Sequence, residues 1–172
     1  IINKDLKRRA IEISYKHGLS HIGSVLSTID MIDAIYDKKK PGDKFVLSMG
    51  HAGLALYCVI EKYFKKPPTT SGIVDKSYEC DAERMLKLQG IHPDRKSDLS
   101  GYIDCSTGSL GHGIGIALGM AITSPDINVY CIVSDGVCSE GSVWEAFRVQ
   151  KELNVDNLHV YVSVNGYGAY KK

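Results

Sequence analysis

Hydrophobic residues recur at three- and four-residue intervals along much of the chain, which is the pattern of helices with one buried face. The repeat is regular over residues 3–17, and Gly18 provides a stop signal. A second helix is expected to begin at Ser27, because the Ser-Thr-Ile-Asp sequence there has the spacing of a capping box. Further helices are predicted at residues 53–63, 81–89, 110–123 and 143–153.

Three short apolar runs predict strands. Residues 129–133 are continuously apolar, as expected for a strand covered on both faces, and residues 45–47 and 158–164 are also strand-like. The predicted helix between the last two strands implies a parallel pair with a right-handed crossover. The pattern therefore predicts an α/β fold, with a mostly parallel sheet flanked by helices on both faces, in a single domain spanning residues 1–172.

Glycines are unusually regular in the predicted helix 110–123. Gly111, Gly115 and Gly119 are four residues apart on one face, so we expect this face to allow close packing of another backbone. The order Gly111-x-Gly113-x-Gly115 also suggests a Rossmann-type nucleotide site. That interpretation is disfavoured, because no apolar strand precedes these glycines and the last glycine is misplaced.

Composition narrows the classes of function. The chain has 21 Lys and Arg residues against 20 Asp and Glu residues, so its formal net charge of +1 gives no case for binding nucleic acid or an anionic membrane. No apolar run approaches the ~20 residues of a membrane span. The five cysteines form no C-x-x-C pair, which disfavours a zinc or redox motif. We expect a cytoplasmic protein without a signal peptide.

Candidate chemistry lies where the last two predicted strands end. Asp135 and Gly136 follow the first of them, and Asn165 and Gly166 follow the second. Neighbouring parallel strands would bring these tips to within ~5 Å of each other, at the edge where open α/β sheets bind ligands. Carboxylate and amide oxygens suit Mg²⁺ or Ca²⁺, and a helix N-terminus after Gly136 favours an anion such as a diphosphate. Either dipeptide alone is more typical of an ordinary turn.

These residues and four further blocks resemble the cofactor-binding domain of the transketolase family. Ser134-Asp135-Gly136, followed by Asn165 thirty positions after the aspartate, resembles the thiamine-diphosphate fingerprint. The other blocks occur in the family's order and span nearly the whole chain. They are His21-Ile22-Gly23-Ser24, Phe45-Val46-Leu47-Ser48-Met49-Gly50-His51-Ala52, Thr107-Gly108-Ser109-Leu110-Gly111-His112-Gly113 and Ser139-Glu140-Gly141-Ser142-Val143-Trp144-Glu145-Ala146.

The resemblance implies a role for individual residues. Asp135 and Asn165 should bind the metal, Mg²⁺ or Ca²⁺, through their side chains, and Tyr167 should bind it through its backbone carbonyl. Asn165 is also expected to belong to the cofactor site. The other expected cofactor contacts are Gly136 and His51 at the diphosphate and Gly108 and Leu110 along the rings of thiamine diphosphate. The expected catalytic residues are His21 and His92, near the substrate hydroxyls, and Glu140, between paired active sites.

The implied activity is transfer of a two-carbon ketol unit between sugar phosphates. This chain would supply the diphosphate- and metal-binding half of the site. In the family a second domain binds the pyrimidine, and no candidate for it is present, so we expect a partner chain or downstream sequence to supply it, with homo-oligomer formation also expected. Ser134 replaces a glycine of the fingerprint and Ser163 replaces a usually acidic residue, which predicts a weaker metal site.

Other functions remain open from the sequence. The same motifs suit other thiamine-diphosphate enzymes, such as a deoxyxylulose-phosphate synthase or a phosphoketolase. A non-catalytic or regulatory subunit with the same fold is also compatible with the two serine replacements.

Overall fold

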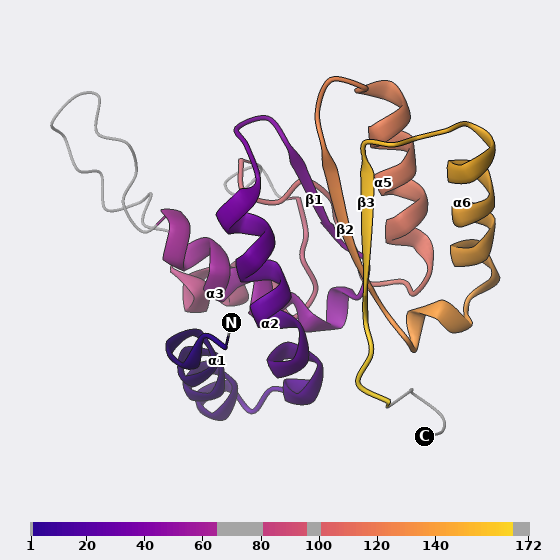
Figure 1. Ribbon diagram of the computed structural model, residues 1–172. Helices are drawn as coiled ribbons and strands as arrows, with labels where there is room; N and C mark the ends of the chain where they lie inside the picture. Colours follow the sequence, from indigo (N-terminus) through magenta and orange to yellow (C-terminus); the bar gives the residue numbers. More distant parts are fainter. Residues whose placement is uncertain (1, 65–80, 96–100, 167–172) are drawn as a thin grey trace, which may run out of the picture.

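The computed structural model describes residues 2–64, 81–95 and 101–166. Its centre is a parallel sheet of three strands in the order β1-β2-β3. The strands are β1 (Lys44–Leu47), β2 (Val129–Ser134) and β3 (Leu158–Ser163). Leu47 is paired with Ile132, and Ser134 with Ser163, so all three strands end at the same edge of the sheet. This edge is at the bottom of Figure 1.

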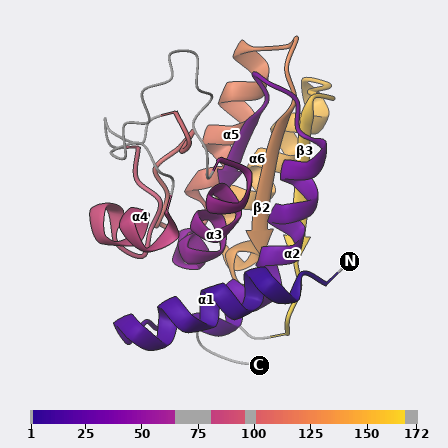
Figure 2. The same ribbon diagram turned by 90° about the vertical axis from the view of Figure 1, so that its left-hand side faces the viewer.

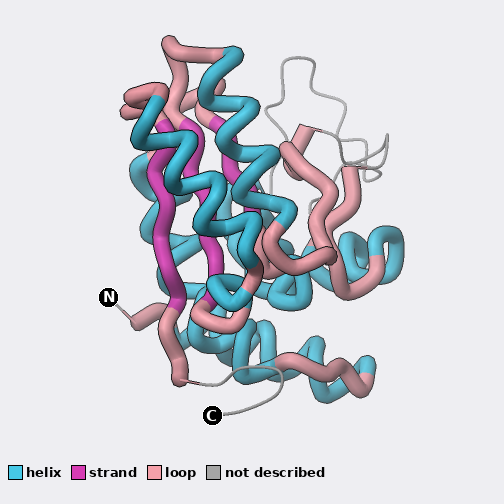
Figure 3. Tube along the Cα trace, turned by 90° about the vertical axis from the view of Figure 1, so that its right-hand side faces the viewer, coloured by secondary structure: helices cyan, strands magenta, loops and turns pink. Residues whose placement is uncertain are grey.

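Helices lie on both sides of this sheet. They are α1 (Lys4–His17), α2 (Ile22–Lys38), α3 (Gly53–Phe64), α4 (Ala82–Gln89), α5 (His112–Thr123) and α6 (Gly141–Glu152), with 3₁₀ turns η1 (Gly50–Ala52) and η4 (Val137–Ser139). Helices α5 and α6 lie on one side of the sheet, and α1, α2 and α3 lie on the other (Figures 1 and 3). The predicted α/β fold, with a parallel sheet between helices, is confirmed. No helix in the described ranges is long and apolar enough to cross a membrane.

The first two helices test the predicted boundaries. Helix α1 agrees with the prediction: the Asn3 side chain accepts a hydrogen bond from the Leu6 amide at 3.2 Å, and Gly18 ends the helix with a φ of 59°. The start of α2 was predicted wrongly. The chain turns at His21, which has a φ of 65°, and is helical from Ile22, while the Ser27 hydroxyl bonds inside the helix to the Ser24 carbonyl. The sequence that starts at Ser27 has the spacing of a capping box but lies inside the helix.

The glycine spacing on α5 also misled the sequence interpretation. Among the described residues, a Cβ added at Gly115 or Gly119 would meet no atom within 4 Å, and one added at Gly111 would meet side chains, with Glu140 Cβ at 2.7 Å, and no other backbone. The close backbone contact is at Gly113, where an added Cβ would lie 2.7 Å from Ser48 Cα, just after β1. Helix α5 packs on β1 and β2 with the face that carries Gly113, which the four-residue repeat does not reveal.

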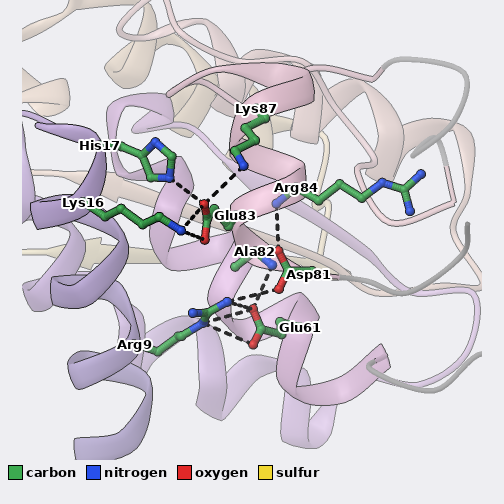
Figure 4. Close-up of polar contacts among 9 residues, drawn as sticks. All are labelled: Arg9, Lys16, His17, Glu61, Asp81, Ala82, Glu83, Arg84 and Lys87. Atoms are coloured by element: carbon green, nitrogen blue, oxygen red, sulfur yellow. Dashed lines mark hydrogen bonds and ion pairs between the residues drawn. The ribbon is translucent and has the colours of Figure 1, made fainter. Parts of the chain in front are cut away.

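Ion pairs tie α4 to α1 and α3 (Figure 4). The Glu61 carboxylate of α3 accepts a hydrogen bond from the first amide of α4, that of Ala82, at 2.8 Å, and it pairs with Arg9 of α1 at 3.3 Å. The same guanidinium lies 3.1 Å from Asp81, which caps α4. These bonds satisfy amides at the start of a helix of only eight residues, which would otherwise depend on solvent.

A second group of charges surrounds Glu83, one residue further along α4 (Figure 4). Lys16 and His17 at the end of α1 lie 2.8 Å and 2.9 Å from its carboxylate, and Lys87 lies 3.3 Å away. Hydrogen bonds from Lys16 first, then from His17, lower the pKa of Glu83 to about 2. The carboxylate is therefore charged at every physiological pH, and the α1–α4 junction stays ionic.

Asp43 is a buried carboxylate at the start of β1. It accepts hydrogen bonds from the backbone amides of Lys40 at 2.9 Å and Asn128 at 3.0 Å, so it connects the segments that lead into β1 and β2. Burial alone would raise the pKa of Asp43, but these amide bonds outweigh it and hold the pKa below its ordinary value.

We expect Asp43→Asn to lower the free energy of unfolding by about 1–2 kcal/mol at pH 7, because one charge-assisted hydrogen bond is lost. A carboxylate with a lowered pKa stabilises the fold above its ordinary pKa of about 4, and this contribution is lost as the pH falls through the lowered value. Urea unfolding between pH 7 and pH 2.5 measures it. The gap between wild type and variant should close in acid; a constant gap would contradict the assignment.

Candidate functional site

The carboxyl ends of the three strands carry the polar residues that the sequence singled out. The turn after β1 leads into η1 and contains His51, the turn after β2 contains Asp135, and the chain after β3 contains Asn165. Because the strands are parallel and in register, these three turns project from one edge of the sheet. The edge combines a carboxylate, a carboxamide and an imidazole.

Asp135 links the turns after β2 and β3. One carboxylate oxygen accepts a hydrogen bond from the Gly136 amide at 3.0 Å, and the other accepts one from the Gly166 amide at 2.9 Å. The second bond brings the chain next to Asn165 against Asp135, across 31 positions of sequence. Each carboxylate oxygen has a second lone pair that these amides leave available to a cation.

The two serines that depart from the fingerprint are both buried. The Ser134 hydroxyl accepts a hydrogen bond from the Val137 amide at 3.1 Å and so holds the η4 turn from beneath. The Ser163 hydroxyl lies 3.5 Å from that of Thr28 in α2. Both side chains thus take part in packing and in turn formation inside the protein, and neither is an exposed part of the strand-end turns.

Three histidines gather next to the turn after β1. The rings of His21 and His51 have centroids 5.3 Å apart. Burial first, and then the charges of His21 and His92, lower the pKa of His51. A lowered pKa favours the neutral imidazole, which can both donate and accept a hydrogen bond.

Backbone contacts lock this turn to the segment that carries Gly108. A Cβ added at Gly50 would lie 2.8 Å from the Thr107 carbonyl carbon and 2.9 Å from the Gly108 amide nitrogen. One added at Gly108 would lie 3.5 Å from the His92 ring. The backbone next to His51 thus approaches the 107–108 segment too closely for a side chain at Gly50, and the His92 ring is within van der Waals distance of Gly108. Leu110, two residues on, is half-buried and packs against the core.

Glu140 lies at the entrance to α6. It is exposed, and an added Cβ at Gly111 would lie 2.7 Å from its Cβ, so the predicted catalytic glutamate sits against the N-terminal end of α5. The Ser142 hydroxyl donates to the Gly111 carbonyl at 3.0 Å and joins the two helix entries. The structure thus brings Glu140 beside the glycine-rich segment, on the α5 and α6 side of the sheet.

A model of the family described as "Transketolase, thiamine diphosphate binding domain" matches residues 9–167. The chain belongs to the transketolase family. It is 32% identical over 185 residues to a protein named "Transketolase" from Homo sapiens, covering 95% of this chain and 27% of that protein. It is 30% identical over 173 residues to an apulose-4-phosphate transketolase subunit from Phocaeicola vulgatus, covering 92% of this chain and 58% of that protein.

Other relatives agree with this family. "Transketolase-like protein 2" from Mus musculus is 37% identical over 134 residues, covering 73% of this chain and 19% of that protein. The solved structure "Transketolase from Leishmania mexicana" superposes with a TM-score of 0.70 at 20% identity, covering 93% of this chain and 26% of that one, and shows a shared fold. The chain thus spans between 19% and 58% of the length of the relatives named here.

The donor set of this transketolase-family chain suits a hard cation. Within the described ranges there is no group of three or more His, Cys, Asp or Glu side chains that could hold a metal ion. The predicted ligands form no such group, because they are one carboxylate, one carboxamide and one backbone carbonyl. Asp135 and Asn165 fit that role by chemistry and by the Asp135–Gly166 contact. Tyr167 lies outside the described residues.

The sequence interpretation missed residues that shape the site without contributing chemistry. Gly50 and Gly113 make the backbone contacts that hold the turn after β1, and the sequence interpretation assigned this role to neither of them. Both occur inside the motif blocks, Gly50 directly before His51 and Gly113 five residues after Gly108, and this was a signal. Which glycines are close to other backbone depends on helix orientation, and this is known only from the packed structure.

Proposed function

We propose that this chain forms the diphosphate- and metal-binding half of a transketolase-like enzyme, which transfers a two-carbon ketol unit between sugar phosphates. The observation that carries the proposal is the 2.9 Å hydrogen bond from the Gly166 amide to Asp135, which joins the turns after β2 and β3. That contact brings the backbone next to Asn165 against the Asp135 carboxylate, and this supports a shared cation site at the ligand-binding edge of a parallel sheet.

Different residues at the strand ends would bind the metal ion, the diphosphate and the rings of the cofactor. Asp135 and Asn165 would hold Mg²⁺ or Ca²⁺ with their side-chain oxygens, and Tyr167 with its carbonyl. Gly136 and His51 would contact the diphosphate. Gly136 precedes η4 and α6, and the positive end of the α6 helix dipole favours an anion nearby. Gly108 and Leu110 would lie along the organic rings of the cofactor.

The histidines would act on the substrate. Thiamine diphosphate, when bound, would supply the carbon that takes up and releases the two-carbon unit. His21 and His92 are exposed beside His51 and would hydrogen-bond to sugar hydroxyls. The lowered pKa of His51 keeps positive charge from accumulating among three neighbouring imidazoles. Glu140, exposed at the entrance to α6, would contact a paired active site.

The pyrimidine-binding half of the site would come from another chain or domain. The Phocaeicola vulgatus relative is named as one subunit of a transketolase, and this chain covers 58% of that protein's length. We therefore propose a partner polypeptide that carries the pyrimidine-binding domain, with assembly into a dimer or larger homo-oligomer. A cytoplasmic location stays a prediction from the cysteine pattern.

Isothermal titration calorimetry of the chain with thiamine diphosphate, with and without Mg²⁺, tests the proposal. We expect binding that requires Mg²⁺ and is abolished by EDTA, because Asp135 and Asn165 would hold the cation and its charge would offset that of the diphosphate. Absence of Mg²⁺-dependent heat would refute it. Turnover of a ketose phosphate and an aldose phosphate is then measured after the candidate partner chain is added. Turnover would indicate that this chain is half of an enzyme, and its absence would indicate a chain that binds the cofactor without catalysis.

A further inference from the structure

Helix α3 contacts the segment that carries His92 at two positions one turn apart. Residues 90–93 follow α4 and lie against the first turns of α3, which begins two residues after His51. The two contact positions are Gly53 and Tyr57, and Figure 2 shows α3 between α4 and the strands. Helix α3 therefore follows His51 directly in the sequence and also contacts the segment that carries His92.

The contact at Gly53 is between backbones. A Cβ added there would lie 2.2 Å from the Ile91 carbonyl oxygen and 3.0 Å from Pro93 Cδ. Gly53 has a φ of −53°, which any residue adopts, so glycine is required by the closeness of the neighbouring chain and by no special dihedral angle. The position of Ile91, and with it that of His92, is thus fixed against the start of α3.

The contact at Tyr57 is polar. Its hydroxyl donates to the Gly90 carbonyl at 3.1 Å, and the residue is fully buried. Burial raises the pKa of Tyr57, so the hydroxyl stays protonated and remains a donor throughout the physiological range. Gly90 has a φ of 81°, a conformation that turns the chain sharply after α4.

The other side of the segment is held by residues 107–108. The Thr107 amide donates to the Pro93 carbonyl at 3.0 Å, and the His92 ring lies 3.5 Å from the Cβ position of Gly108. The 107–108 backbone also touches Gly50, next to His51. His92 thus lies between α3 and a segment that contacts the His51 turn, so a shift of residues 90–93 changes the separation of the two imidazoles.

From this geometry we propose that Gly53 and Tyr57 are positioning residues that set the location of the His92 imidazole relative to His51. The catalytic meaning of that spacing rests on the proposed function, since His92 would face the sugar and His51 the diphosphate. The spacing itself does not depend on the cofactor and is measured on the chain alone.

The test is an NMR titration of the histidine rings in the full chain without cofactor, comparing wild type with Tyr57→Phe. The variant keeps the ring and removes only the donor to Gly90. We expect the measured pKa of His51 to rise toward its ordinary value, because His92 moves away and its charge acts less on His51. The resonances of His92 should shift as well. Tyr15→Phe, at a residue 91% exposed on α1, is the matched control and should leave both histidines unchanged.

Gly53→Ala is the stronger variant, because the added methyl group displaces the Ile91 carbonyl. It should shift His51 in the same direction and further, provided near-UV circular dichroism shows a native fold; if it does not fold, Tyr57→Phe decides. Wild-type titration of His51 and His92 in a folded Tyr57→Phe protein would overturn the role of Tyr57, even if its melting temperature fell. Failure of thiamine diphosphate to bind the wild-type chain would count against the proposed function and leave this result unaffected.

Discussion

Replacing Asp135 by alanine is expected to abolish Mg²⁺-dependent binding of thiamine diphosphate to this chain. Asp135 is the only acidic residue among the predicted metal ligands, and its carboxylate also bonds to the Gly136 and Gly166 amides. Alanine removes the anionic ligand and the contact that holds the chain near Asn165. Since loss of residues that merely support metal ligands costs 10–100-fold in affinity, loss of the ligand itself should exceed about a hundredfold. Calorimetric titration measures the change.

Two further variants separate charge from structure. Asp135→Asn keeps one oxygen as an acceptor and loses the charge, so it should also weaken Mg²⁺-dependent binding strongly if the cation is held there. Asp156→Ala, in the exposed turn at the opposite end of β3, removes the same charge from the protein and should bind like wild type. Undiminished affinity in both Asp135 variants would remove the metal assignment, and the proposed function with it.

Gly113→Ala is expected to lower the free energy of unfolding by up to about 2 kcal/mol. The added methyl group would lie 2.7 Å from Ser48 Cα, and this backbone has little room to move because the Ser48 amide is bonded to the Ile132 carbonyl of β2 at 2.8 Å. Overpacking of this kind usually costs 1–3 kcal/mol, and here it exceeds the gain of about 1 kcal/mol from replacing glycine by alanine in a helix. The strain should also displace the turn that carries His51, which urea unfolding combined with histidine NMR would detect.

Gly115→Ala in the same helix is the matched control. An alanine there meets no atom of the described residues within 4 Å, so only the helix preference is expected to act and the variant should be more stable by up to about 1 kcal/mol. Opposite signs at two glycines only two positions apart are the diagnostic result. Equal effects at Gly113 and Gly115 would show that α5 does not pack against the end of β1 in the way described.

Much of the fold follows from local sequence. The apolar run at residues 129–133 became the buried centre of β2, and the strand–helix–strand order became the parallel pair β2 and β3. Asn3 and Gly18 marked the ends of α1, because a side-chain acceptor and a left-handed glycine each satisfy helix-end groups through neighbouring residues. These features need few distant contacts, so a pattern in one stretch of chain is sufficient to predict them.

The starts and faces of helices were predicted less well, for a physical reason. Ser27 has the sequence of a cap and yet lies inside α2, since the helix gains from burying Val25 and Ile29 on one continuous face. The regular repeat pointed to Gly111, Gly115 and Gly119 as sites of close backbone packing, while the close backbone contact is at Gly113. The position of a helix boundary or contact face depends on what packs against it, and that information lies elsewhere in the chain.

The sequence by itself determined the chemical inventory: one carboxylate and one carboxamide following two strands, three histidines, and the motif order of the transketolase family. Only the tertiary structure decided how these groups meet. The Gly166 amide reaches Asp135 because two parallel strands end in register, and His92 comes near His51 because Gly53 admits the backbone of Ile91. Both are contacts between residues 31 or more positions apart, and their distances are set by strand register and close backbone packing, which no local pattern encodes.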